Sequence, residues 1–174
     1  FRGSVYGRHH PLNIARVWPV IDICRALEWL DDSCFETVLP ATESDLHRFH
    51  TFDYVSALKD AQRDQELDDI RRQRHRIGMD SNPIFPQVYD RPATAAAASI
   101  QGARYLLEGR YSAVFNPSGG THHGMPDKAN GFCFVNDPAL ALLTLAEHPD
   151  ARIAYLDIDA HHPDGVQDTL SSHP

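Results

Sequence analysis

The stretch "YLDIDAHHPDG" at residues 155–165 places three aspartates and two histidines directly behind an apolar lead-in. This lead-in belongs to "RIAYLDID", which predicts a short buried strand over 152–159. Side chains of an extended segment alternate between two faces, so Asp157, Asp159 and His161 are expected to share one face. Unpaired polar groups at the end of a buried strand are costly, and a divalent cation would pair them.

Asp159 and His161 are the candidate metal ligands in this stretch. Carboxylate and imidazole groups suit Zn²⁺, Fe²⁺ or Mn²⁺, and no cysteine pattern nearby indicates a thiolate-rich structural zinc. Two protein ligands with room for water indicate a catalytic site rather than a structural one. Taken singly, such an aspartate more often caps a following helix and such a histidine more often lies on the surface. The joint pattern with a second histidine pair favours the metal site.

The second pair is His122 and His123 in "GGTHHG", residues 119–124. Alone, this motif would indicate a glycine-rich turn with two exposed imidazoles. Beside a metal, however, neutral imidazole can serve as the base for an attacking water and as the acid for a leaving amine. Such histidines work best with a carboxylate on the far nitrogen, which fixes the tautomer, and Asp157 and Asp164 are the available carboxylates.

Hydrophobic periodicity and helix-end signals predict an α/β fold with a parallel sheet flanked by helices. The second expected strand is "SAVFN" at 112–116. Both histidine pairs follow a predicted strand, at the carboxyl ends where sites gather in such sheets. Helices are expected over 12–30, from 53 toward 76 (in part as exposed helix or loop), over 93–109 and over 136–148. Gly109 is the expected C-cap of the third helix, and the fourth is expected to begin with Asn136 or Asp137 as N-cap and Pro138 in its first turn. Loops are expected over 79–92 and 117–131.

The composition narrows the class of protein. The 174 residues are 42% hydrophobic with a formal net charge of −8, which suits one globular domain. No cluster of Lys and Arg is interleaved with aromatics, so direct nucleic-acid binding is not expected. No apolar run reaches the roughly 18 residues of a membrane span. Three widely spaced cysteines predict neither a disulfide framework nor a redox motif, and favour a reducing, cytoplasmic location.

Two long motifs resemble the zinc-dependent histone deacetylase superfamily, and especially its bacterial acetoin-utilisation-type members. They are "NPSGGTHHGMPDKANGFCFVNDPALAL" at 116–142 and "RIAYLDIDAHHPDGVQDTL" at 152–170. The stretches "YGRHHPLNIARV", "FHTFDYVSALK" and "NPIFPQVYDRPAT" are similar to that family as well. The resemblance implies an arginase/deacetylase-like fold, of which residues 1–174 would be the N-terminal portion of a single catalytic domain.

The resemblance also implies roles for individual residues. His122 and His123 match the tandem catalytic histidines, Asp157 and Asp164 the carboxylates that support them, and Asp159 and His161 the first two metal ligands. Gly131 and Phe132 match the lining of the acyl-lysine channel, Asp90 matches a rim acid that grips the substrate backbone, and Arg16 an arginine near an internal acetate cavity. The implied ions are Zn²⁺, with Fe²⁺ as the alternative, and a K⁺ beside the "DID" stretch.

Two departures from the family pattern stand out. Pro163 replaces the glycine that commonly follows the second histidine, which removes a backbone donor and fixes φ beside Asp164. The family's third metal ligand, an Asp, and its transition-state Tyr or His come from segments beyond Pro174. We therefore expect this chain to need a C-terminal half of the domain and to be inactive by itself.

The predicted function is metal-dependent hydrolysis of an N-acetyl amide, such as acetyl-lysine, an acetylated polyamine or a small acylated amine, to free amine and acetate. One alternative is a binuclear manganese ureohydrolase of the arginase kind, which would place an acid two residues after the histidine; Asp164 lies three after His161. The other is a non-catalytic acyl-binding or scaffold relative. The sequence predicts neither the physiological substrate nor the oligomeric state.

Overall fold

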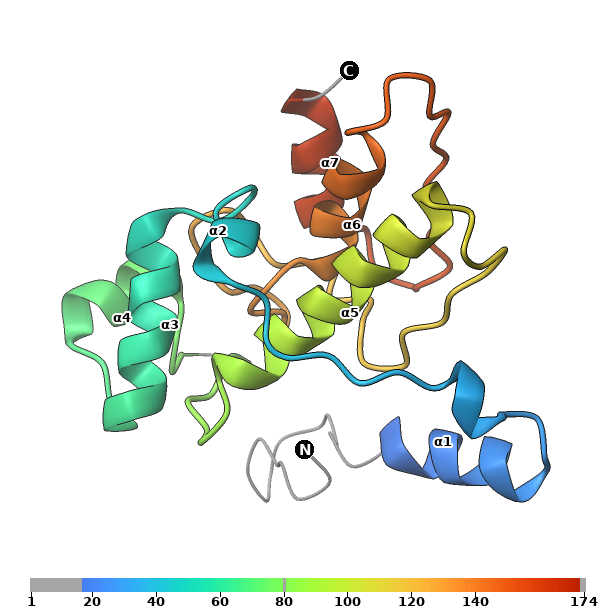
Figure 1. The fold of residues 1–174 in the computed structure, drawn as a ribbon. Helices are drawn as coiled ribbons and strands as arrows, with labels where there is room; N and C mark the ends of the chain where they lie inside the picture. The colour runs from blue at the N-terminus through green and yellow to red at the C-terminus, as the bar shows by residue number, and fades with distance from the viewer. Residues whose placement is uncertain (1–16, 80, 173–174) are drawn as a thin grey trace.

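The alanine-rich helix α5 (Asp90–Leu107) is the central element of the fold, and it packs against α6 (Asp137–Leu145), as Figure 1 shows. The computed structural model describes residues 17–79 and 81–172. Ala93, Ala96 and Ala103 of α5 are buried, and their small side chains let the neighbouring elements approach closely. The two helices therefore form the frame on which the loops that carry the histidine pairs are mounted.

The remaining helices lie around this frame (Figure 1). Several begin with the side-chain caps that their sequences predict: at the helix starting with Glu43, Thr42 and Asp45 form a capping box, and Asp68 caps the helix that starts at Asp69. The other elements are α1 (Val17–Ala26), the 3₁₀ helix η2 (Asp32–Cys34), α2 (Glu43–Leu46), α3 (Phe52–Asp64), α4 (Asp69–His75) and α7 (Asp164–Ser172).

One hydrophobic core joins α2, α3, α5 and α6 with the loops between them. The phenol of Tyr54, on α3, is fully buried and donates a hydrogen bond to the Phe134 carbonyl at 2.6 Å, which ties α3 to the loop before α6. The core residues are Ala41, Leu46, Tyr54, Val55, Ala57, Leu58, Ala61, Leu67, Ile77, Phe85, Val88, Ala93, Ala96, Ile100, Ala129, Phe134, Val135 and Leu140.

The helix predictions are confirmed within the described residues, with shifted ends. Helix α5 begins three residues earlier than predicted, with Pro92 in its first turn, where the missing N–H costs nothing. Gly109 follows its end at a φ of +66°, as the predicted C-cap requires. Asn136, not Asp137, is the N-cap of α6. The start of the predicted helix over 12–30 lies outside the described residues.

The predicted parallel sheet is not confirmed. Residues 17–79 and 81–172 form no β-strand, and their only β-bridges are isolated antiparallel ones, Met79 to Asn82 and Asn130 to Cys133. The segments 112–116 and 152–159 run without a ladder partner among the described residues. A buried parallel strand needs a hydrogen-bonded neighbouring strand and helices on both faces of the sheet, and an isolated pair of strands is at best marginally stable.

The expectation that both segments are buried is also wrong. The sequence places Leu156 and Ile158 opposite Asp157, and this alternation is present, but the two apolar side chains are 85% and 92% exposed. Asp157 instead faces inward, onto a histidine. Segment 112–116 does touch the helical frame, because a methyl group added at Gly102 of α5 would lie 2.8 Å from Val114. Among the described residues, no helix has the length and apolar character needed to cross a membrane.

Candidate active site

His122 and Asp157 form the more buried of two histidine–carboxylate pairs. His122 Nδ1 lies 2.8 Å from Asp157 Oδ2, and the histidine side chain is only 8% exposed. The hydrogen bond from His122, and then one from the Tyr155 hydroxyl, lower the pKa of Asp157 to about 2. Asp157 is therefore ionised at neutral pH, so in the neutral form of the His122 ring Nδ1 carries the proton and Nε2 has the free lone pair.

His123 and Asp164 form the second pair. His123 Nδ1 lies 2.7 Å from Asp164 Oδ1, at the first residue of α7. Asn130 donates to the other carboxylate oxygen at 2.8 Å, so the acid is oriented from both sides. The predicted reach of Asp157 and Asp164 to the two histidines is thus confirmed, and Pro163 does not prevent it.

The two imidazoles lie together, with ring centroids 4.2 Å apart. Both belong to one loop, whereas their acids come from the segment before α7 and from α7 itself. Gly131 lies directly against this pair, because a methyl group there would come within 2.7 Å of the His123 ring. The two rings meet edge to face at 60°, and each is held by a carboxylate at its Nδ1.

Asp159 and His161, the predicted metal ligands, lie beside the pairs. The His161 ring is 5.9 Å from that of His123, and its Nδ1 lies 2.9 Å from Asp159 Oδ1. Two atoms bound to one tetrahedral zinc, each about 2.0–2.1 Å from it, are roughly 3.3 Å apart. With 51% and 78% exposure, the two side chains are free to adopt that separation, so their chemistry and placement fit a divalent cation.

The ligand set for such a cation is incomplete in the described part of the chain. Within residues 17–79 and 81–172, no group of at least three His, Cys, Asp and Glu side chains is placed to hold a metal ion. The pair of Asp159 and His161 would therefore bind a cation only together with ligands from elsewhere.

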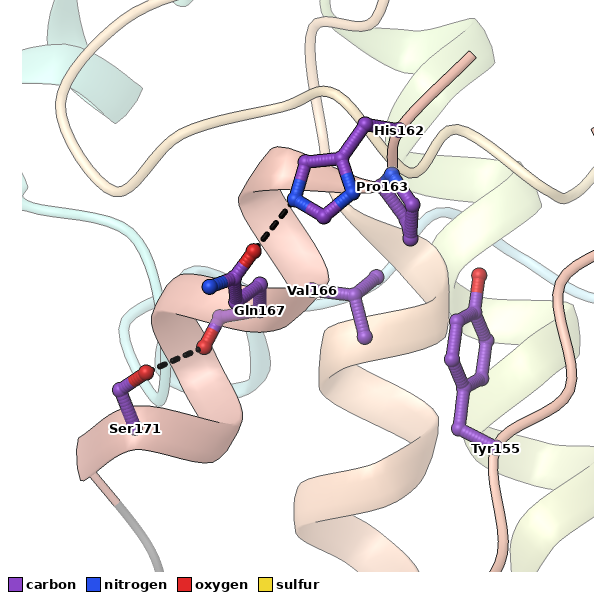
Figure 2. A pocket seen from close by; sticks show the side chains of 6 residues that line it. All are labelled: Tyr155, His162, Pro163, Val166, Gln167 and Ser171. Carbon is purple, nitrogen blue, oxygen red and sulfur yellow. Dashed lines mark hydrogen bonds between the residues drawn. The ribbon is translucent and has the colours of Figure 1, made fainter. Parts of the chain in front are cut away.

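His162 points toward Gln167 on α7, as Figure 2 shows. Its ring contacts Gln167 on α7 and lines a pocket of about 390 Å³ with Tyr155, Pro163 and Val166. None of the four paired histidine and aspartate residues lines this pocket. The His162 side chain is thus engaged on α7, whereas the His161 ring lies near that of His123.

The predicted substrate residues have different placements. Phe132 adopts a φ of +59°, a left-handed conformation that is strained for a residue with a side chain, and its N–H donates to Asn82 at 2.9 Å. Asp90 lies at the start of α5, where its carboxylate accepts a hydrogen bond from Gln62 at 2.8 Å, and no contact joins it to the histidine pairs among the described residues. Arg16 lies outside the described residues.

His50, a buried histidine that the site prediction missed, supports the loop that carries His122 and His123. His50 Nε2 accepts a hydrogen bond from the Asn136 N–H at 3.0 Å, and its Nδ1 lies 3.0 Å from the Met125 carbonyl. Its neutral Nδ1–H tautomer satisfies both partners. The Asn136 side chain then donates to the carbonyls of Gly124 at 2.9 Å and His122 at 3.3 Å. Chain separations of 75 and 86 residues explain why no local pattern revealed this contact.

His50 is expected to make the folded protein sensitive to mild acid. Burial lowers its pKa from the ordinary 6.5 to about 4, so between these values the unfolded state binds more protons. Stability should therefore fall as pH falls through this window, by up to about 3 kcal/mol. Urea unfolding across pH 7 to 4 measures the slope. His50→Gln should be less stable at pH 7 but show a shallower slope, whereas His162→Gln should keep the wild-type slope. Equal slopes for wild type and His50→Gln would contradict this account.

The geometry defines a class of site. Two imidazoles with fixed tautomers, beside an Asp–His pair suited to a cation, are the components of a metallohydrolase centre. A family model of the histone deacetylase domain matches residues 10–174. The chain therefore belongs to the histone deacetylase family.

Individual relatives agree with this assignment. The acetoin utilization protein AcuC of Bacillus subtilis is 31% identical over 174 residues, which are 100% of this chain and 45% of AcuC. Histone deacetylase 2 of Oryza sativa subsp. japonica is 37% identical over 168 residues, 95% of this chain and 33% of that protein. The crystal structure of an HDAC homolog from Aquifex aeolicus matches with a TM-score of 0.88 and 35% identity, covering 96% of this chain and 44% of that one. The chain thus spans less than half the length of these relatives.

Proposed function

We propose that the protein hydrolyses an N-acetyl amide to a free amine and acetate. The observation that carries this proposal is the presence of two adjacent histidine–aspartate pairs, His122–Asp157 at 2.8 Å and His123–Asp164 at 2.7 Å, with ring centroids 4.2 Å apart. Amide hydrolysis needs a base for the attacking water and an acid for the departing amine. Adjacent imidazoles that share one face of a site can supply both.

His122 acts as the base in this proposal. Its Nδ1 proton is committed to an ionised Asp157, so the Nε2 lone pair accepts the proton of the water. Asp157 remains a carboxylate throughout, because its pKa of about 2 lies far below that of an imidazolium, and it stabilises the positive charge that forms on His122. His123, oriented by Asp164, delivers a proton to the leaving nitrogen from its protonated imidazolium form. The proton taken up by His122 then returns to His123 through solvent, which restores both rings after the amine departs.

Asp159 and His161 would hold the metal, for which we propose Zn²⁺, with Fe²⁺ as the alternative. When bound, such an ion polarises the acyl carbonyl and lowers the pKa of the attacking water. We further propose that Gly131 and Phe132 line the channel for the amine's aliphatic stem, and that Asp90 grips the substrate backbone at its rim. The contact of Gly131 with the His123 ring supports the channel assignment. From the family resemblance we also propose a K⁺ beside the "DID" stretch.

A substrate panel tests the proposed function. The protein expressed from its complete gene, purified and loaded with Zn²⁺, is assayed for acetate release from an acetyl-lysine peptide and an acetylated polyamine, and for urea release from arginine. We expect acetate from at least one acetyl amide and about one metal ion per chain. Urea release with two metal ions would indicate a ureohydrolase, and acetyl-peptide binding without hydrolysis would indicate a scaffold; either result would overturn the proposal.

A further inference from the structure

Asp137 is a buried carboxylate to which the proposed chemistry gives no role. It is the first residue of α6 and is only 2% exposed. A carboxylate at this depth is costly unless hydrogen bonds satisfy it, and the positive end of the α6 dipole supplies only part of that stabilisation. Its hydrogen-bond donors therefore indicate what the carboxylate does in the fold.

The donors come mainly from the loop that carries the catalytic histidines. Asp137 Oδ1 accepts from the Thr121 N–H at 2.8 Å and from the Thr121 hydroxyl, and Oδ2 accepts from the Gly120 N–H at 3.1 Å. Ser99 on α5 donates to Oδ2 at 2.6 Å. The carboxylate thus bridges the helical frame and the two residues directly before His122.

The fit between this carboxylate and the loop is close. A methyl group at Gly119 would overlap Asp137 Oδ2, so only glycine permits the approach. The N–H groups of Gly120 and Thr121 can only donate, and the Ser99 hydroxyl donates to Oδ2, which suits an ionised carboxylate that only accepts. The Thr121 hydroxyl lies between Asp137 Oδ1 and the Val135 carbonyl, which share its one proton. Asparagine has the same shape but would place an NH₂ group against a donor. The site therefore selects for charge as well as shape.

We propose that Asp137 is a positioning residue, which fixes the backbone entering His122 so that its ring stays on Asp157. This inference rests on the proposed function. Asn136, the preceding residue, holds the carbonyls of His122 and Gly124 on the other side of the loop. The start of α6 thereby clamps the loop before and after the catalytic imidazoles. Misplacement of a reacting group by about 1 Å can cost about 10²-fold in rate.

The test is Asp137→Asn in the complete, metal-loaded protein. We expect kcat to fall about 10- to 100-fold while KM changes by less than about 3-fold, because geometry rather than binding is disturbed. The nitrogen-bound ring proton of His122, followed by NMR in protein with ¹⁵N-labelled histidine, should shift or broaden as its hydrogen bond to Asp157 lengthens. Leu140→Val, a buried change on the same helix away from the loop, is the control: it should lower Tm but leave kcat and the His122 signal unchanged.

A folded Asp137→Asn variant with wild-type kcat and an unchanged His122 signal would overturn the inference, as would a kcat loss equal to that of Leu140→Val. If Asp137→Asn does not fold, Thr121→Val decides by the same two readouts. It removes one donor from the carboxylate and should show a smaller change in the same direction. Should the wild-type protein hydrolyse no acetyl amide, the proposed function fails, while the His122 signal still tests the positioning role.

Discussion

His122→Ala is expected to lower kcat for acetyl-amide hydrolysis by about 10²-fold or more while leaving KM nearly unchanged, because it removes the proposed general base. The imidazole makes its contribution as the proton of water is transferred, so the loss should appear in turnover. Steady-state kinetics of the complete, metal-loaded protein with an acetylated peptide measures both constants.

His162→Ala is the matched control for this variant. It also removes one imidazole from the same region, but that ring contacts Gln167 on α7 and lines a pocket that none of the paired histidines and aspartates lines. Its kcat should stay within about 3-fold of wild type, as expected for a group outside the reacting geometry. Wild-type turnover in His122→Ala would remove this histidine from the mechanism.

Asp157→Asn is expected to have the other large effect, lowering kcat by about 10²- to 10⁴-fold, because an amide at this position can stabilise the wrong tautomer of its histidine. The NH₂ group of the introduced amide can donate to Nδ1 of His122, which would move the ring proton to Nε2 and block that nitrogen as a base. The substitution also removes the negative charge that stabilises the imidazolium.

Asp164 allows a comparison with Asp157, because the two carboxylates differ in how exposed they are. Asp164 is 42% exposed at its side chain and contacts the histidine proposed as the acid, whereas Asp157 is 15% exposed and contacts the proposed base. Asp164→Asn should therefore lose less kcat than Asp157→Asn, since solvent screens the charge that is removed. Stopped-time assays of acetate release on both variants give the ratio. An equal or larger loss in Asp164→Asn would reverse the assigned roles.

The histidine–aspartate pairs could be predicted from sequence because the chemistry of a metal site demands a carboxylate for each imidazole, and few carboxylates were available. The helices could be predicted because periodicity and caps are local, as the N-cap at Asn136 illustrates. The strands predicted at 112–116 and 152–159 do not form among the described residues, because a strand exists only with a partner. The apolar residues around Ile158 predict a buried strand whether or not neighbouring strands are present to pair with it.

The two residues that support the loop of His122 and His123 could not be predicted from sequence for a related reason. His50 reaches the loop across 75 and 86 residues of chain, so no spacing rule connects it to the site. Asp137 lies where the sequence predicts the N-cap of a helix, and that prediction already accounts for a polar residue there without any contact to a histidine. Its burial and its four hydrogen-bond partners become visible only in three dimensions. Helix-capping rules thus predicted the position of Asp137 at the start of α6 but not its contact with the loop that carries His122 and His123.

The most direct test of the central claim is a double-mutant cycle on His122 and Asp157, measured as kcat for acetyl-amide hydrolysis by the complete, metal-loaded protein. If the two residues act as one unit, Asp157 matters only through His122, so Asp157→Asn in a His122→Ala background should change kcat by less than about 3-fold. Independent, multiplicative losses would contradict the claim that this pair, held at 2.8 Å, forms the base of the reaction.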